Sequence, residues 1–228
     1  MIIECRNLTK QYLADKSIVP AVRNVNLVVD RREFVVILGH SGSGKTTLLS
    51  LIGGLTVPDS GEVLINGVEN WHQSDEALSD MRNTTIGFVF QFASLIPTLT
   101  ALENVLLPLT FGRSARGSHE QARDILARVG LQDKMHSFPG QLSGGQQRRI
   151  AIARAFINQP DIILADEPTG DLDEETEGDI LRIFRDYNEK GTTFVVVTHN
   201  MHLAQTQRNP RVLEMRQGAL RERKGLAE

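Results

Sequence analysis

The chain has 228 residues, of which 40% are hydrophobic and 23% charged, a composition typical of a folded globular protein rather than a disordered one. Its formal net charge of −3 at pH 7 excludes the basic excess with which nucleic-acid-binding proteins neutralise phosphates. Its one cysteine, Cys5, cannot form an internal disulfide, and nowhere do 18 apolar residues follow one another. We therefore expect no nucleic-acid partner, a reducing compartment and no membrane-spanning helix.

The first 30 residues predict two extended segments. The second is the clearer of them, because residues 21–29 alternate apolar and polar side chains for most of their length. Tyr12 lies in the first segment, where its ring either packs into the strand face or offers a stacking surface to an adenine base. Another strand, over residues 62–65, precedes Asn66-Gly67, a dipeptide typical of a hairpin turn. Together these segments predict a small antiparallel sheet.

Between these segments lies a glycine-rich loop. Five apolar residues, 34–38, lead into Gly-His-Ser-Gly-Ser-Gly-Lys-Thr-Thr at 39–47, which predicts a buried strand, a turn and a helix. Three glycines let the backbone turn and aim N–H groups inward at the positive end of the helix, so this loop predicts a polyphosphate site. Lys45 would contact the β- and γ-phosphates, and the Thr46 hydroxyl would bind Mg²⁺. The expected nucleotide-binding residues of this loop are Gly39, Ser41, Gly42, Ser43, Gly44, Lys45, Thr46 and Thr47.

Two later apolar runs are predicted strands that end in polar residues. Residues 86–90 lead into Gln91, and residues 162–165 lead into Asp166 and Glu167. The carboxyl ends of strands are where an α/β sheet places its chemistry, so these side chains are candidates for a site. Asp166 suits a Mg²⁺ ligand, and Glu167 suits a base that takes a proton from attacking water. The plain alternative is a pair of surface acids at the end of a strand.

Four further features, taken one by one, indicate ordinary structure. Residues 118–129 predict an amphipathic helix, and Asp173 predicts the N-cap of another. Residues 142–146, Leu-Ser-Gly-Gly-Gln, are a second glycine-rich turn that opens a helix, which alone indicates an N-cap. Residues 194–198 predict a strand that ends at His199, and a lone histidine is usually structural or solvated. This histidine, however, lies at the same strand ends as the other candidates.

Taken in order, these motifs resemble the series found in ATP-binding cassette (ABC) transporter ATPases. The motifs that carry the resemblance are the phosphate loop 39–46, Gln91, Leu-Ser-Gly-Gly-Gln at 142–146, the strand and acids at 162–167, Asp173 and His199. The likeness spans essentially the whole chain, and the Leu-Ser-Gly-Gly-Gln motif ahead of an apolar strand and Asp-Glu is particular to that superfamily. It implies an α/β P-loop NTPase fold with a mostly parallel central sheet, an N-terminal antiparallel β layer and an inserted helical subdomain.

The resemblance also implies the domain organisation and the roles of individual residues. Residues 1–228 would form one ABC ATPase domain, with an ATP-binding core of residues 1–91 and 160–228 and a helical subdomain of residues 92–159. Tyr12 is similar to the adenine-stacking aromatic residue of the family. The implied catalytic residues are Glu167 as the base, His199 as the switch that holds the γ-phosphate, Gln91 and Lys45. The implied Mg²⁺ ligands are Thr46, Gln91 and Asp166.

Family resemblance implies partners as well. Two copies would sandwich two ATP molecules in a head-to-tail dimer with Asp173 at its interface, each copy completing the other's site with Ser143, Gly144, Gly145 and Gln146. The dimer would drive integral-membrane permease subunits from the cytoplasmic face of a bacterial inner membrane, as a peripheral protein.

The subclass is the last implication of the resemblance. Residues 89–105 and 165–173 look most like the lipoprotein-releasing and macrolide-export type, which exports or releases lipoproteins, peptides or drugs. His40 and Asp171 depart from the residues commoner in the superfamily at these positions. The alternative is a cell-division-type or other regulatory ABC ATPase that signals to a membrane partner without transporting a solute.

Overall fold

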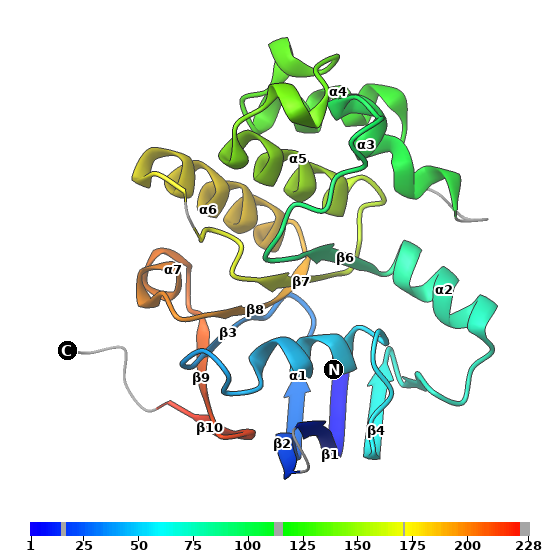
Figure 1. Cartoon of the computed structure of the whole chain (residues 1–228), viewed down its shortest axis with the longest axis vertical. Helices are drawn as coiled ribbons and strands as arrows, with labels where there is room; N and C mark the ends of the chain where they lie inside the picture. The colour runs from blue at the N-terminus through cyan, green and yellow to red at the C-terminus, as the bar shows by residue number, and fades with distance from the viewer. Residues whose placement is uncertain (15–16, 112–115, 171, 224–228) are drawn as a thin grey trace. The chain divides into compact units, whose positions relative to one another are not determined.

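The computed structural model describes residues 1–14, 17–111, 116–170 and 172–223 (Figure 1). The chain divides into two units, of which the first combines Met1–Leu78 with Thr193–Glu228 and the second is Ser79–Thr192. Asp171, one of the two departures from the family pattern, lies outside the described residues.

The first unit contains an antiparallel sheet with strand order β2-β1-β4-β5, which confirms the predicted antiparallel layer. The hairpin turn is also confirmed, because Ile65 pairs with Val68 and both turn residues, Asn66 and Gly67, have positive φ, at 53° and 78°. The elements of this unit are β1 (Ile3–Ala14), β2 (Ser17–Val29), β3 (Phe34–Leu38), α1 (Lys45–Ile52), β4 (Ser60–Ile65), β5 (Val68–Glu69), β8 (Thr193–Thr198), α7 (Met201–Thr206), β9 (Arg211–Arg216) and β10 (Ala219–Glu222).

Parallel strands form the second layer of the first unit. β3 pairs in parallel with β8 on one side and β9 on the other, and β10 returns antiparallel to β9. Every residue of β3 and β8 is buried, as the apolar runs Phe34–Leu38 and 194–197 predict for strands covered on both faces. The helix α1 is the next element after β3 and contacts β8. The strand and the helix therefore fix the two ends of the glycine-rich loop that joins them.

The second unit combines a pair of parallel strands with helices. β6 and β7 pair in register, with Val89 opposite Ala165, and α5 contacts β6, α3 and α4. Figure 1 shows α3, α4 and α5 gathered in this unit. Its elements are β6 (Ile86–Val89), α3 (Ala101–Leu106), η1 (Leu107–Thr110), α4 (His119–Arg128), η2 (Gln132–Lys134), η3 (Pro139–Gln141), α5 (Gly144–Phe156), β7 (Ile162–Asp166) and α6 (Glu174–Glu189), while α2 (Asp75–Thr84) begins in the first unit and ends in the second.

Three predicted helix starts are confirmed by their caps. The side chains of Ser118, Ser143 and Asp173 accept hydrogen bonds from backbone N–H groups in the first turns of α4, α5 and α6, respectively. Ser143 forms a full capping box, because its own N–H donates to the side chain of Gln146 at 2.9 Å. Among the described residues no helix is both long enough and apolar enough to cross a membrane.

Candidate active site

The glycine-rich loop of the first unit has a backbone that only glycine permits at two positions. Gly44 has φ of 103°, and a Cβ there would lie 1.9 Å from the carbonyl oxygen of Ala21. A Cβ at Gly39 would lie 2.5 Å from the carbonyl oxygen of Met215. The loop is therefore held against its neighbours by close backbone approach. Its last glycine is the N-cap of α1, so the free N–H groups of the helix start face the loop.

Lys45 shows what kind of ligand would suit this loop. Its side chain is buried, with 7% exposure, and its ammonium donates to the carbonyl oxygens of Gly39 at 2.6 Å and His40 at 3.2 Å. Both partners are neutral, and a buried charge is costly unless an opposite charge compensates it. The hydroxyl of Ser43 is also buried and has no hydrogen-bond partner among the described residues. A cationic loop with a spare buried donor fits an oxygen-rich anion such as a polyphosphate.

Open space adjoins this loop within the same unit. A pocket of about 520 Å³ lies beside it, lined by residues 40–43 of the loop, by Met215 and Arg216 at the end of β9 and by Gln217 in the turn that follows. The turn is fixed to the loop because the N–H of Gly218 donates to the carbonyl oxygen of Ser43 at 3.0 Å. Of the residues predicted to bind phosphate, 41–43 line this pocket and are thus reachable from outside the unit.

His199 leaves the parallel strands at the same edge as the phosphate loop. Leu38 pairs with Thr198 in parallel register, so Gly39 and His199 are the next residues of neighbouring strands. His199 is exposed, and the following N–H, that of Asn200, donates to the Thr198 hydroxyl at 3.0 Å. The structure thus brings the histidine and the loop to one edge, as the strand pattern predicts.

Tyr12 presents its ring at the surface of the antiparallel sheet. The residue is 44% exposed, so part of the ring is open to a stacking partner while the rest is covered by the protein. The ammonium of Lys10 lies 5.7 Å from the ring centroid and pairs with the Asp59 carboxylate at 2.8 Å. That ammonium, together with the N–H of Gln11, holds the pKa of Asp59 below its usual value. No local pattern predicts this Lys10–Asp59 pair, because its members lie far apart in the chain.

In the second unit the predicted acids lie at the end of β7. Asp166 is its last residue and is buried, with 5% exposure, while Glu167 is partly exposed. Glu167 has φ of 45°, a left-handed conformation that is uncommon for a residue with a side chain. Gln91 follows the neighbouring strand β6 and is exposed. Gln91 and the two acids therefore leave parallel strands at one edge, as predicted.

The Leu-Ser-Gly-Gly-Gln turn also belongs to the second unit. Ser143 and Gly144 are exposed, and Gly145 and Gln146 are partly exposed, at the start of α5. Arg148, one turn further along, donates from Nη1 to the carbonyl oxygen of Glu167 at 2.7 Å. Sequence reasoning missed this residue, and the only signal for it was a basic side chain soon after the turn.

The loop and the strand-end acids define a class of protein, the P-loop nucleotide-binding ATPases of α/β fold. Residues 22–170 match the ABC transporter family, and this chain belongs to that family. It is therefore an ATP-hydrolysing ABC protein, with the P-loop ABC ATPase fold expected from the sequence.

Individual relatives support the same conclusion. An uncharacterized ABC transporter ATP-binding protein of Thermotoga maritima is 49% identical over 203 residues, which cover 89% of this chain and 87% of that protein. Two solved structures of the ATP-binding cassette MJ0796 are each 42% identical, over 99% of this chain and all of that one. One is a dimeric post-hydrolysis state bound to ADP and Pi, with a TM-score of 0.89. The other is described as a dimeric bacterial ABC transporter cassette, with a TM-score of 0.90.

Proposed function

We propose that the chain binds Mg-ATP, hydrolyses it in a head-to-tail dimer and thereby drives a separate membrane permease. The nucleotide would lie with its phosphates on the residues 39–47 loop and its adenine against Tyr12. Support for the phosphate position comes from the buried ammonium of Lys45, whose hydrogen-bond partners among the described residues are two neutral carbonyl oxygens. Support for the adenine position comes from the exposed ring of Tyr12.

The residues proposed to hold Mg²⁺ are Thr46, Gln91 and Asp166. This set has a single carboxylate, which fits Mg²⁺, because that ion usually binds one or two carboxylates together with substrate phosphates and water. The described residues contain no cluster of three or more His, Cys, Asp or Glu side chains that could hold a metal by themselves, so the phosphates would be needed to complete the shell. When bound, Mg²⁺ would neutralise charge on the β- and γ-phosphate oxygens.

Hydrolysis would follow the roles that the family resemblance implies. Glu167 would accept a proton from a water molecule as the water oxygen attacks the γ-phosphorus, and the bond to the bridging oxygen would break to leave ADP and inorganic phosphate. Lys45 and His199 would stabilise the charge on the transferred phosphoryl group, and Gln91 would orient the water. The partial exposure of Glu167 supports its role, because the carboxylate can be reached by water.

The observation that carries the dimer proposal is the environment of Gly144. A Cβ at this position would meet nothing within 4 Å, and its φ is not in the left-handed region. The described part of the chain therefore gives no reason for a glycine there. A nucleotide bound by a second copy would give one, because it needs close approach to the helix start. The MJ0796 cassette is itself dimeric in two solved structures.

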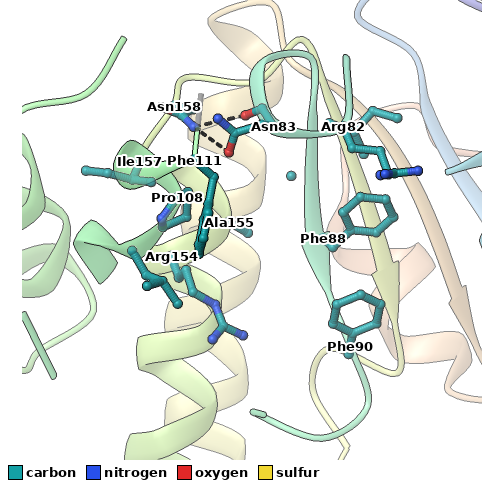
Figure 2. A pocket seen from close by; sticks show the side chains of 13 residues that line it. Arg82, Asn83, Phe88, Phe90, Pro108, Phe111, Arg154, Ala155, Ile157 and Asn158 are labelled. Carbon is teal, nitrogen blue, oxygen red and sulfur yellow. Dashed lines mark hydrogen bonds between the residues drawn. The ribbon is translucent and has the colours of Figure 1, made fainter. Parts of the chain in front are cut away.

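A pocket in the second unit supports the permease as partner. It has a volume of about 260 Å³, and Figure 2 shows Phe88 and Phe90 on one side and Phe111, Pro108 and Arg154 on the other. Phe90 and Phe111 are 40% and 76% exposed, and exposed aromatic residues around a pocket are typical of a surface that contacts another protein. We propose that a cytoplasmic segment of the permease inserts an apolar side chain here. Residues 92–159 would then be the subdomain that contacts the permease, with residues 1–91 and 160–228 as the ATP-binding core.

The proposed cargo class rests on sequence likeness to the lipoprotein-releasing and macrolide-export type in residues 89–105 and 165–173. The chain would accordingly work at the cytoplasmic face of a bacterial inner membrane and energise export or release of a lipoprotein, peptide or drug. The relatives found are transporter cassettes, so the regulatory alternative is not favoured.

The molar mass of the Glu167→Gln protein, measured by light scattering with and without Mg-ATP, tests the dimer. The substitution should block turnover while ATP still binds, so the nucleotide should convert monomer to dimer. The matched control is the same protein with Lys45→Met, which should stay monomeric because the loop has lost its cation. A Glu167→Gln protein that binds ATP yet stays monomeric would contradict a sandwich formed by the chain alone.

A further inference from the structure

Arg148 ties the helix that follows the Leu-Ser-Gly-Gly-Gln turn to the backbone of Glu167. Its side chain is buried, with 8% exposure, in the second turn of α5. The guanidinium donates to the carbonyl oxygen of Glu167 at 2.7 Å, a short distance typical of a charge-assisted hydrogen bond. The N–H of Gly170 donates to the same oxygen at 3.2 Å. The carbonyl of Glu167 is thus held from two sides.

The backbone of Glu167 needs such support. Its φ of 45° lies in the left-handed region, which costs free energy for any residue with a Cβ and persists only where neighbours enforce it. Glu167 is also the first residue after β7, whose last residue is Asp166, so it lies where the regular strand has ended. The direction in which its carboxylate leaves the chain depends on this φ. A bond that fixes the carbonyl therefore also limits the directions in which the side chain can leave the backbone.

A second contact joins the same two segments. A Cβ added to Gly145 would lie 3.4 Å from Cδ2 of Leu172, so the first turn of α5 packs closely against the loop that follows Glu167. Gly145 and Arg148 lie on the same helix, and Glu167 and Leu172 lie on the same loop. The start of α5 and the loop after β7 are consequently held together by both packing and a buried hydrogen bond.

From this geometry we propose that Arg148 is a positioning residue for Glu167, an inference that rests on the proposed role of Glu167 as the base. Because α5 begins at Ser143 and Gly144, Arg148 transmits the position of that turn to the base of the same chain. In the proposed dimer the turn contacts the nucleotide of the second copy. The contact with one nucleotide would thereby help to align the base that acts on the other.

The test is a double-mutant cycle built from Arg148→Met and Glu167→Gln, which separates action through Glu167 from general damage. Arg148→Met alone should lower kcat by about 10-fold, with the KM for ATP changed less than about 2-fold, because the base loses alignment while the phosphate loop stays intact. In the Glu167→Gln protein, measured by single-turnover hydrolysis, Arg148→Met should change the residual rate by less than about 2-fold. Lysine at position 148 keeps a cationic donor and should recover part of the lost kcat.

Arg149→Met is the matched control. Arg149 is the next residue of α5 and donates from Nη1 to the carbonyl oxygen of Val129 at 3.1 Å, so its replacement removes the same kind of bond away from Glu167. It should lower the melting temperature by an amount similar to Arg148→Met and leave kcat within about 2-fold of the wild type. If the Arg148→Met protein does not fold, Arg148→Lys and Arg149→Lys make the same comparison.

Three results would overturn the proposal. These are an Arg148→Met kcat within about 2-fold of the wild type, equal kcat losses at positions 148 and 149, and effects of Arg148→Met and Glu167→Gln that multiply. Failure of the proposed function looks different, because Glu167→Gln alone would then retain most of its turnover whatever happens at Arg148.

Discussion

The phosphate loop of the first unit and the Ser-Gly-Gly turn of the second are both glycine-rich helix starts. They differ in whether the packing of the chain itself requires a glycine. Gly39 and Gly44 are required by the chain itself, because a Cβ at either position would collide with a backbone carbonyl. Gly144 is not, since a Cβ there would meet nothing. Gly39 and Gly44 of the phosphate loop are therefore needed for the packing of the loop against its own chain. At Gly144 nothing within the described chain requires a glycine, so the open space there can admit a molecule from outside the chain.

Replacing Gly44 should have the largest effect on stability, because a side chain at this position would collide with the backbone of the same chain. Alanine there places its Cβ 1.9 Å from the Ala21 carbonyl and must keep φ near 103°. We expect Gly44→Ala to lower the free energy of unfolding by about 3 kcal/mol, as measured by denaturant titration. Gly42→Ala is the control: its φ of 75° brings strain, but its Cβ would meet nothing. It should cost only about 1 kcal/mol, and equal losses at both positions would refute the collision.

A substitution in the first unit should abolish ATP binding, whereas one in the second unit should slow hydrolysis and leave binding intact. Glu167→Gln in the second unit should lower kcat by about 100-fold or more, because water loses its proton acceptor, while ATP still binds. Lys45→Met in the first unit should abolish binding, because the loop loses its buried cation. Steady-state turnover and equilibrium binding of a fluorescent ATP analogue distinguish the two. Retention of most turnover by Glu167→Gln would remove the base assignment.

Gly144→Asp tests the other half of the comparison. A carboxylate in the first turn of α5 interacts favourably with the helix dipole and meets no neighbour, so the melting temperature should be unchanged or raised. The same charge would repel a nucleotide phosphate of a second copy, so ATP-dependent dimerisation of the Glu167→Gln protein should weaken by about 10-fold or more. Gly178→Asp is the control, because Gly178 also lies in a helix where a Cβ meets nothing. Normal dimerisation of the Gly144→Asp protein would mean that the turn is only a helix cap.

Local patterns explain why much of the fold could be predicted. The apolar runs of strands β3 and β8, the Asn66-Gly67 turn and the cap at Ser143 are each encoded within a few consecutive residues. Helices α2 and α3 were nevertheless not predicted, although Thr100 and Glu103 display the capping box that starts α3. A short helix with few apolar residues gives a weak periodic signal, and the nearby Pro97 is typical of a loop.

The part of the candidate site that lies at the ends of strands could be predicted from the sequence. The positions of Gln91, Asp166 and His199 follow from parallel pairing, because each comes at or after the end of a recognisable strand. The bond from Arg148 to Glu167 could not be predicted, since it joins residues 19 apart through a side chain whose direction depends on tertiary packing. The left-handed φ of Glu167 was equally hidden, because no glycine or asparagine at that position signals it.

The smallest expected effect compares two similar cation–ring pairs, one in each unit. Lys10 lies 5.7 Å from the ring centroid of Tyr12, and Lys190 lies 5.8 Å from that of Tyr187. If Tyr12 stacks on adenine, Lys10 supports the ring from its other side, and a cation–π contact contributes about 0.5–1 kcal/mol. Lys10→Met should therefore raise the KM for ATP by about 2–5-fold without changing kcat.

The matched substitution Lys190→Met should leave KM unchanged, because Tyr187 lies on α6 and has no proposed part in binding. Inhibition by inorganic tripolyphosphate gives a further control, since that ligand has phosphates but no base. Its inhibition constant should be the same for the wild type and for Lys10→Met. A parallel loss of affinity for ATP and tripolyphosphate would show that Lys10 acts on the phosphates, and an unchanged KM for ATP would show that the ring needs no support from Lys10.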